Sequence, residues 1–337
     1  MADRRPTQPI IGEAPAFLEM LEHVSRAAPL NKPVLVVCER GTGKELIASR
    51  LHFLSERWEQ GVVKVNCAAL TETILESELF GHEAGAFTGA VKTHVGHFER
   101  ADAGTLILDE LSTISLRMQE KILRVIEYGE IQRVGGSDTL RVDVRIVGST
   151  NSDLPTLAAA GKFRRDLLDR LAFDVITVPP LRERPEDIMP LAYTFAINMA
   201  SELRRSFFPG FSPRASSALL RHNWAGNVRE LKNSIERSVY LSDEPDTPIS
   251  NISFDPFDSP FKLAMPAESA RQAAEPQRAP LLPTDLASRL IDTEKEFLEA
   301  ALERARFNQR LAADLLGLSY HQLRGKLRKH EISGRPA

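Results

Sequence analysis

Short runs of β-branched and aliphatic residues alternate with longer mixed stretches in the first half of the chain. Four of these runs, residues 34–37, Val62–Asn66, Thr105–Asp109 and 144–150, have the length and continuous apolar character of buried strands. The segments between them are long enough to form helices. The pattern therefore predicts an α/β fold in which helices cover both faces of a parallel sheet.

The pattern changes after the last of these runs. Residues 190–240 carry apolar positions at helical spacing, which predicts a small helical subdomain. Residues 258–283 contain five prolines among Ala, Glu, Gln and Ser, a composition typical of a linker. A helical pattern returns over residues 284–332. The predicted organisation is an α/β subdomain over 1–180, a helical subdomain over 181–257, a linker over 258–283 and an all-α domain over 284–337.

Composition and charge narrow the class of protein. Hydrophobic residues make up 42% and charged residues 26% of the 337 residues, which excludes a wholly disordered, collagenous or coiled-coil chain. The net charge of −3 is unevenly divided, because eight Lys or Arg and two acids from Arg304 onward give +6 and leave −9 for residues 1–303. A basic end on an acidic body is typical of binding to a polyanion.

Location follows from what the sequence lacks. No run reaches the roughly 18 apolar residues of a membrane helix, and the first residues have no signal-peptide core. We expect a cytoplasmic protein without direct membrane insertion. Cys38 and Cys67 are too few for a disulfide framework and lack zinc-site spacing, so both are predicted to be core residues.

A candidate phosphate-binding turn follows the first predicted strand. Gly41, Gly43 and Lys44 precede apolar residues at helical spacing, as in a P-loop, where backbone N–H groups and a lysine hold phosphates. The strict P-loop has glycine at the position of Cys38 and a hydroxyl at that of Glu45, so an ordinary glycine turn is the alternative. The residues predicted to bind the nucleotide here are Glu39, Arg40, Gly41, Thr42, Gly43, Lys44 and Glu45.

Polar residues end two of the predicted strands. Asp109 and Glu110 lie at the carboxyl end of the third strand, where ligands bind in open α/β sheets. Asp109 is predicted to hold Mg²⁺ and Glu110 to polarise the attacking water. The alternative, that the two acids only cap a helix, leaves Lys44 without a role. Thr150 and Asn151 end the fourth strand and could sense the γ-phosphate or position water.

Two arginines flank a short apolar patch further along. Arg164 and Arg170 could stabilise transition-state charge in phosphoryl transfer, often from a neighbouring subunit. Taken alone, they also fit surface ion pairs.

The basic end has capping and turn residues at the spacing of a helix-turn-helix. Asn308 can cap a helix reaching Leu316, Gly317 makes a turn, and Ser319 can cap a second helix reaching about His330. The alternative is a solvated basic helix. The residues predicted to face DNA are Ser319, Tyr320, His321, Gln322, Arg324, Lys326, Arg328 and Lys329. The residues predicted to pack the unit are Leu311, Leu315, Leu318, Leu323 and Leu327. A preceding amphipathic helix is predicted to dimerise the module through Leu290, Phe297, Leu298, Ala301 and Leu302.

A six-residue segment carries the most specific signal. Gly85-Ala86-Phe87-Thr88-Gly89-Ala90 reads as a flexible loop with Phe87 at its tip and Thr88 as a polar contact for another protein. The alternative is a connector whose Phe87 folds back. Supporting blocks are residues 78–82, 98–102, 123–127, 182–184 and 227–231. With these blocks, the chain from about Ile11 to Tyr240 resembles the AAA+ activators of sigma-54 RNA polymerase, also called bacterial enhancer-binding proteins.

The resemblance implies an AAA+ P-loop ATPase with a parallel sheet and a helical lid, followed by a Fis-like helix-turn-helix domain. It implies a ring, expected to be a hexamer, that hydrolyses ATP with Mg²⁺ and remodels the closed complex of sigma-54 RNA polymerase through residues 85–90. It further implies binding to upstream enhancer DNA, with dimers formed through the DNA-binding domain. The family's usual residue at the position of Cys38 is glycine, whereas Glu45 is normal for it.

The same resemblance assigns roles residue by residue. Lys44 corresponds to the Walker A lysine, and Asp109 with Glu110 to the Walker B pair. Asn66 corresponds to the residue that restrains the Walker B glutamate until ATP is read. The remaining correspondences are sensor I at Thr150 and Asn151, trans-acting arginines at Arg164 and Arg170, and sensor II at Arg229.

Trp58 has two interpretations. Its spacing from Ile47, Leu51 and Leu54 fits a core residue at a helix end. In the phage-shock branch of the family, a tryptophan in this segment contacts the inhibitor phage shock protein A, which makes Trp58 a candidate regulator contact. Two other functions remain open, namely a AAA+ repressor and a general protein remodeller.

Overall fold

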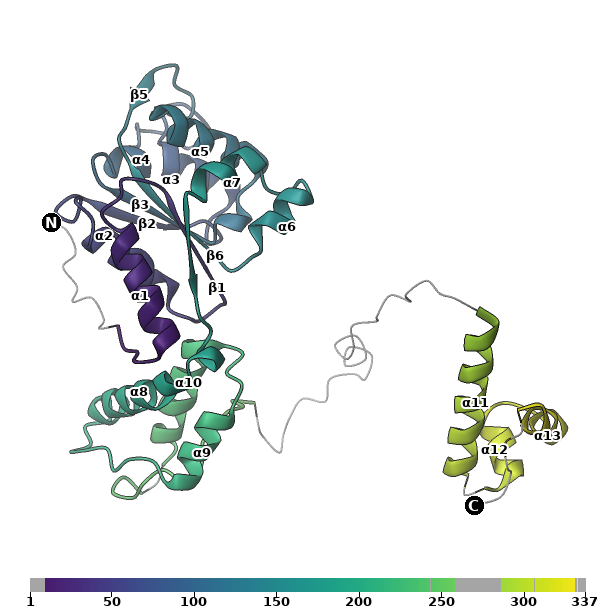
Figure 1. The fold of residues 1–337 in the computed structure, drawn as a ribbon. Coiled ribbons are helices and arrows are strands. Elements are labelled where there is room, and N and C mark those ends of the chain that lie inside the picture. The colour runs from purple at the N-terminus through teal and green to yellow at the C-terminus, as the bar shows by residue number, and fades with distance from the viewer. Residues whose placement is uncertain (1–9, 243, 258–285, 306, 331, 333–337) are drawn as a thin grey trace. The chain divides into compact units, whose positions relative to one another are not determined.

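The computed structural model describes residues 10–242, 244–257, 286–305, 307–330 and 332 (Figure 1). Contacts divide the chain between Ser259 and Pro260 into two units, which are described separately. The predicted linker, residues 258–283, lies outside the described residues. None of the described helices is long and apolar enough to cross a membrane.

A five-stranded parallel sheet forms the centre of the first unit (Figure 1). Its order is β2-β3-β6-β1-β7, and every pairing within it is parallel. The strands are β1 (Val34–Cys38), β2 (Val62–Asn66), β3 (Thr105–Asp109), β6 (Arg145–Thr150) and β7 (Asp174–Val178). The four predicted strands are confirmed. The sequence analysis missed β7, because Asp174 and Thr177 interrupt the apolar run of this edge strand.

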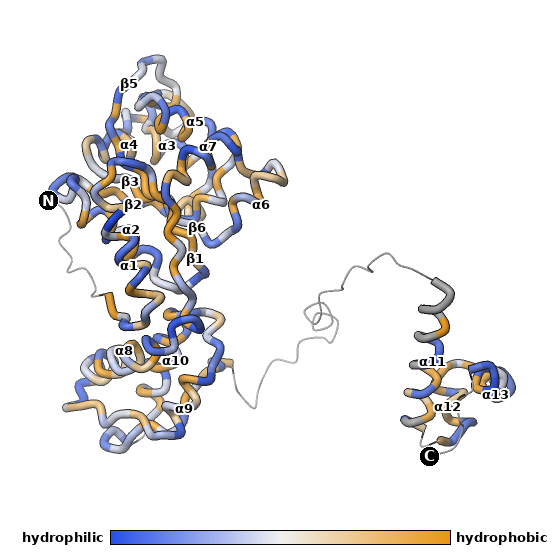
Figure 2. Tube along the Cα trace, in the orientation of Figure 1, coloured by the Kyte–Doolittle hydropathy of each residue, from blue (hydrophilic) through white to orange (hydrophobic). Residues whose placement is uncertain are grey.

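Helices cover both faces of the sheet. On one face, α1 (Pro15–Ala27) and α2 (Lys44–Phe53) share a core with Val34 and Val36. Leu35 points to the opposite core, as the period of two in a strand requires. The helices on that face are α3 (Glu72–Phe80), α4 (His97–Arg100), α5 (Leu116–Tyr128), α6 (Leu154–Ala159) and α7 (Arg165–Leu171). The strands are accordingly among the most hydrophobic parts of the trace (Figure 2).

Three shorter elements complete this layer. A 3-10 turn, η1 (Leu111–Thr113), follows β3 directly. A two-stranded antiparallel hairpin of β4 (Glu130–Gln132) and β5 (Thr139–Arg141) lies between α5 and β6 in the chain. The sequence analysis did not predict this hairpin, because its three-residue strands are too short to show a pattern.

The predicted helical subdomain is confirmed within the first unit. Its elements are η2 (Leu181–Glu183), η3 (Pro185–Asp187), α8 (Ile188–Glu202), α9 (Pro213–Arg221) and α10 (Asn227–Tyr240). Trp224 is fully buried in its core and donates from Nε1 to the carbonyl oxygen of Leu219 at 2.9 Å. This subdomain is called the lid below.

The second unit contains α11 (Leu286–Arg304), α12 (Gln309–Leu315) and α13 (Tyr320–Lys329). Asn308 caps α12, Ser319 and Gln322 form a capping box at α13, and Gly317 has φ 64° in the turn. The predicted helix boundaries of the helix-turn-helix are therefore confirmed to within one residue.

The core of the second unit corrects part of the prediction. Leu323 and Leu327 are buried and Leu318 packs against them, but Leu311 is 50% and Leu315 54% exposed. The buried positions of α12 are Ala312 and Ala313, and Leu311 and Leu315 share a different face of the helix, one turn apart. The α11 residues Leu298, Ala301 and Leu302 are buried in this same core, whereas Phe297 is exposed. The prediction that Leu298, Ala301 and Leu302 form a dimerisation face is therefore wrong. The side chain of Leu290 lies outside the described residues.

Candidate nucleotide site and protein-binding surfaces

The turn between β1 and α2, the predicted phosphate-binding turn, depends on two glycines. Gly41 and Gly43 have φ values of 79° and 98°, in the left-handed region that favours glycine. A side chain at Gly41 would lie 2.3 Å from the carbonyl oxygen of Gly226, so this position must also be small. Cys38 is the last residue of β1 and pairs in register with Val178, which explains why a non-glycine residue is accommodated there.

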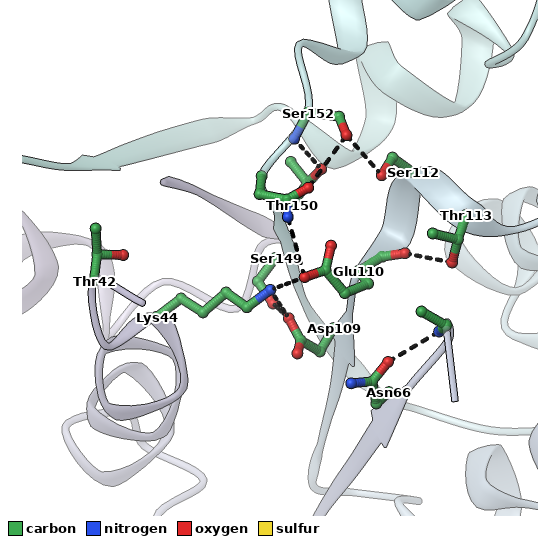
Figure 3. A network of polar contacts seen from close by, with 12 residues as sticks. Thr42, Lys44, Asn66, Asp109, Glu110, Ser112, Thr113, Ser149, Thr150 and Ser152 are labelled. Atoms are coloured by element: carbon green, nitrogen blue, oxygen red, sulfur yellow. Dashed lines mark hydrogen bonds and ion pairs between the residues drawn. The ribbon is translucent and has the colours of Figure 1, made fainter. Parts of the chain in front are cut away.

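Lys44, at the first position of α2, reaches the carboxyl end of β3 (Figure 3). Its Nζ lies 2.7 Å from Asp109 Oδ1 and 2.6 Å from Glu110 Oε1. Burial alone would lower the pKa of Lys44, but its bonds to the two carboxylates outweigh burial and raise the pKa above the ordinary value. A charged lysine with two acids at the end of a parallel sheet supports the phosphate-site prediction over a plain glycine turn.

Residues at the end of the neighbouring strand β6 contact the two acids, which together with Lys44 are called the acidic centre below. Ser149 Oγ donates to Asp109 Oδ1 at 2.6 Å, and Asn151 Nδ2 donates to Glu110 Oε1 at 3.4 Å. Glu110 itself has φ 54°, an uncommon conformation for a residue with a side chain. Sequence reasoning missed Ser149, although a polar residue near the carboxyl end of a buried strand was a usable signal.

Asn66 and Thr150 lie at the same sheet edge with different partners (Figure 3). Asn66 is the register partner of Asp109, but its Oδ1 accepts from the amide of Ala68 at 2.9 Å. The hydrogen bonds to the carboxylate of Glu110 come instead from Lys44 and Asn151. Thr150 is fully buried and accepts from the amide of Ser152 at 3.0 Å. The restraint of Glu110 by Asn66 therefore stays a prediction.

The two candidate trans-acting arginines make ion pairs within this chain. Arg164 Nη2 lies 2.7 Å from Asp166 Oδ2, and Arg170 Nε lies 3.0 Å from Glu127 Oε1. Leu167, between the two arginines in the chain, is buried, as is Leu171, which follows Arg170. Both arginines are held at the surface by exposed or partly exposed partners, so they can exchange those partners at little cost.

The lid reaches the phosphate-binding turn directly. The backbone N–H of Arg229, the predicted sensor II residue, donates to the carbonyl oxygen of Gly41 at 3.2 Å. Sequence reasoning gave no role to Asn227 and Arg182, which bind Glu39, or to Arg184, which donates to the carbonyl oxygen of Thr42 at 3.3 Å. These residues stand within sequence blocks already singled out, but their partners are more than 140 residues away.

Residues 85–90 form a closed turn between α3 and α4. The amide of Gly85 donates to the carbonyl oxygen of Ala90 at 2.8 Å, and Gly85 and Gly89 have positive φ. Thr88 is exposed, and Phe87 is 39% exposed with its ring centroid 5.0 Å from that of His82. Phe87 is thus neither free of the body nor folded into its core, and one edge-to-face contact holds it.

The two cysteines are buried, as predicted. Burial raises the pKa of Cys67 to about 12 and also raises that of Cys38. Both are therefore thiols at neutral pH and weak nucleophiles.

Metal binding is limited by the donors present. Among the described residues no group of three or more His, Cys, Asp or Glu could hold a metal ion. The small donor set of Asp109 and the adjacent Glu110 suits Mg²⁺, which usually keeps several waters and is bound by one or two carboxylates together with the phosphates of a nucleotide.

Trp58 lies beyond the end of α2 and is 57% exposed. The core interpretation is therefore wrong, because the chain leaves the helix at Phe53 before the stripe of Ile47 and Leu51 can include Trp58. Its role as a regulator contact stays a prediction.

Helix α13 and its cap expose most of the residues predicted to face DNA. The exposed ones are Ser319, Tyr320, His321, Gln322, Arg324, Arg328 and Lys329. Lys326 differs, because its Nζ forms an ion pair with Glu294 of α11, which also bonds His330 Nε2 at 2.8 Å. Bonds from Lys326 and His330 hold the pKa of Glu294 down at about 2. Lys326 therefore links α13 to α11 through an ion pair, although its side chain is still half-exposed.

Three families match successive parts of the chain. Residues 10–177 match the sigma-54 interaction domain, residues 182–259 the AAA+ ATPase lid domain, and residues 290–330 the Fis family of bacterial regulatory proteins.

Similar proteins agree with this division. The chain is 57% identical over 323 residues to the Psp operon transcriptional activator of Escherichia coli (strain K12), covering 96% of this chain and 98% of that protein. It is 44% identical to the Nif-specific regulatory protein of Azotobacter vinelandii, covering 93% of this chain and 57% of that protein. The crystal structure of NtrX from Brucella abortus in complex with ATP is 32% identical with a TM-score of 0.66, covering 96% of this chain and 70% of that one. The chain therefore belongs to the sigma-54-dependent transcriptional activators, with an AAA+ domain, a lid and a Fis-type helix-turn-helix domain.

Proposed function

We propose that this activator hydrolyses ATP as a ring, expected to be a hexamer, and uses residues 85–90 to remodel the closed complex of sigma-54 RNA polymerase into an open complex. The observation that carries the proposal is the convergence of Lys44, Asp109 and Glu110 at the carboxyl edge of the sheet. A phosphate-binding turn beside two acids is the arrangement that phosphoryl transfer to water requires. The similarity to the Psp operon activator supports a role in the phage shock response.

The residues of the acidic centre divide the work. Lys44 would leave the carboxylates to bind the phosphates, and Asp109, oriented by Ser149, would hold Mg²⁺, which when bound would supply positive charge for the phosphate oxygens. Glu110 orients the attacking water and accepts a proton from it. Asn66, Thr150 and Asn151 set the position of the Glu110 carboxylate and of the water.

The ring completes the site. Arg164 or Arg170 of one subunit reaches the nucleotide of its neighbour after exchanging its ion pair with Asp166 or Glu127. The exchange replaces a surface ion pair by a contact between the arginine and a phosphate bound to the neighbouring subunit. Bound nucleotide would thereby stabilise the ring, and the arginine would stabilise the transition state.

Residues 85–90 are proposed as the contact with sigma-54. Thr88 is exposed and Phe87 is held by a single ring contact with His82. Phe87 can therefore lose its contact with His82 without exposing the core. Phe87 and Thr88 can then bind another protein through an aromatic side chain and an adjacent hydroxyl.

Binding to upstream DNA is assigned to α13. We expect Arg324→Ala to weaken binding of the full chain to upstream DNA by about 5- to 100-fold, the usual loss for an arginine that reads a base edge. Mobility shifts with upstream and random DNA of equal length measure this loss. Arg304→Ala, an exposed arginine on α11, is the matched control. Equal weakening by both substitutions, or equal affinity for the two DNAs, would remove specific readout from α13.

Negative control is proposed to act through Trp58 and phage shock protein A. An aromatic side chain exposed beyond the end of α2 is suited to dock a partner. We expect Trp58→Ala to abolish inhibition of the ATPase by that protein while changing the unfolding free energy by less than about 0.5 kcal/mol. Titrating the inhibitor into steady-state assays tests this, with Tyr240→Ala, another exposed aromatic, as control. Undiminished inhibition of the Trp58 variant would refute the assignment.

A further inference from the structure

Asn227 joins three separate segments at the junction of the lid with the phosphate-binding turn. It is fully buried at the start of α10 and has φ 54°. Its Oδ1 accepts from the amide of Leu181 at 2.7 Å. Its Nδ2 donates to Glu39 Oε2 and to the carbonyl oxygen of Arg40, both at 3.1 Å. One side-chain amide thus bonds η2, the lid helix and the turn that is proposed to hold phosphate.

Glu39 is held at this junction from a second side. Arg182 donates to both of its carboxylate oxygens, at 2.6 and 2.8 Å. Bonds from Arg182 and then Asn227 lower the pKa of Glu39 to about 2, so the carboxylate is charged at neutral pH. A bidentate pair of this kind fixes geometry as well as charge.

The turn is also in contact with the lid backbone. The carbonyl oxygen of Gly226 lies where a side chain at Gly41 would be, and the N–H of Arg229 binds the carbonyl oxygen of Gly41. Residues 39–41 are therefore held by atoms from two parts of the lid, η2 and the start of α10. Hydrogen bonds are steeply dependent on distance, so a shift of the lid by a fraction of an ångström alters this set.

We propose that Asn227 is a positioning residue which, together with Glu39 and Arg182, links occupancy of the phosphate-binding turn to the orientation of the lid. Bound nucleotide orders the turn and thereby tightens the junction, and a loosened junction weakens nucleotide binding by the same factor, because linkage is reciprocal. Through this junction, hydrolysis in one subunit reaches the lid. The inference rests on the proposed binding of nucleotide at Lys44.

A polarity swap tests the contact itself. Asn227→Asp keeps the acceptor for Leu181 but turns an oxygen toward Glu39, so the affinity for ADP should fall about 10- to 100-fold. Glu39→Gln keeps one acceptor oxygen but loses one of the two bonds from Arg182, so the affinity should fall less than in Asn227→Asp, by about three- to tenfold. In the double variant the new amide at position 39 can donate to the new carboxylate at position 227, whereas the carbonyl oxygen of Arg40 still lacks its donor, so the affinity should rise at least about threefold above that of Asn227→Asp.

The transmission to the lid has its own readout. In wild type, saturating ADP should slow hydrogen exchange at the amide of Leu181 and in the first turn of α10, and in Asn227→Asp saturating ADP should not. Asn233→Asp, an exposed asparagine on α10, is the matched control. Asn227→Gly permits the positive φ without the amide, and should repeat the loss if Asn227→Asp fails to fold.

The outcomes separate this inference from the function on which it rests. Failure of the double variant to recover, or equal ADP protection of the lid in wild type and Asn227→Asp, would overturn the link. Absence of ADP binding by the wild-type chain would instead overturn the proposed nucleotide site.

Discussion

The Glu110→Gln variant is expected to bind ATP with near wild-type affinity and to hydrolyse it at least about 100-fold more slowly. The amide keeps the size of the side chain and its contact with Asn151, so the turn that binds phosphate stays intact. It cannot accept the proton of the attacking water. Steady-state phosphate release and the dissociation constant of a fluorescent ATP analogue, measured on the same preparation, check both halves of this result.

Loss of one ion pair with Lys44 is a second consequence of this substitution. Because Lys44 retains Asp109, we expect it to stay within reach of phosphate. Glu22→Gln, an exposed acid on α1, is the matched control and should hydrolyse ATP at the wild-type rate. A Glu110→Gln rate within tenfold of wild type, or equal loss of binding and turnover, would contradict the role assigned to Glu110.

Thr88→Ala is expected to leave ATP hydrolysis largely intact and to lower open-complex formation by about 30-fold or more, the size of a hot-spot loss at an interface. Thr88 is exposed on a closed turn, and no described contact joins it to the Lys44 centre. Its hydroxyl is therefore available to another protein. Permanganate footprinting of a sigma-54 promoter, run beside phosphate release, measures the two activities together.

A threonine elsewhere controls for the substitution. Thr247→Ala, exposed in the loop after α10, should leave both activities unchanged. Parallel loss of hydrolysis and promoter opening in Thr88→Ala would mean that residues 85–90 support the ATPase rather than the contact with sigma-54.

The sheet was predictable from the sequence where burial on both faces leaves a continuous apolar run. Thr105–Asp109 shows this run, and its last residue marks the edge at which ligands bind. The edge strand Asp174–Val178 has one face less buried, so its pattern is broken by Asp174 and Thr177. Helix caps were equally readable, because Asn308 and Ser319 act through neighbours two or three residues away.

Long-range partners were not readable from the sequence. Asn227 binds Glu39 across 188 positions, and nothing in the local sequence of either residue indicates the other. The ion pair of Lys326 with Glu294 likewise depends on how α13 packs against α11. Leu311 and Leu315 were assigned to the core by residue type, whereas the small Ala312 and Ala313 occupy it.

The chemistry of the site was predicted better than its geometry. Lys44, Asp109 and Glu110 were identified by residue type and order, and the structure places an oxygen of each carboxylate within 2.7 Å of Lys44 Nζ. The supporting hydrogen bond of Ser149 and the ring contact of Phe87 with His82 emerged only from the fold. A family resemblance names the parts of such a site, but the contacts that orient them depend on packing.

The most direct test of a nucleotide-driven activator is transcription in a purified system. The full chain, sigma-54 RNA polymerase and a template carrying upstream DNA are combined with ATP or with a non-hydrolysable analogue. We predict full-length transcript with ATP and none above background with the analogue, although both nucleotides bind. A repressor or a general protein remodeller would give no ATP-dependent transcript, and transcript of equal yield with the analogue would contradict the requirement for hydrolysis.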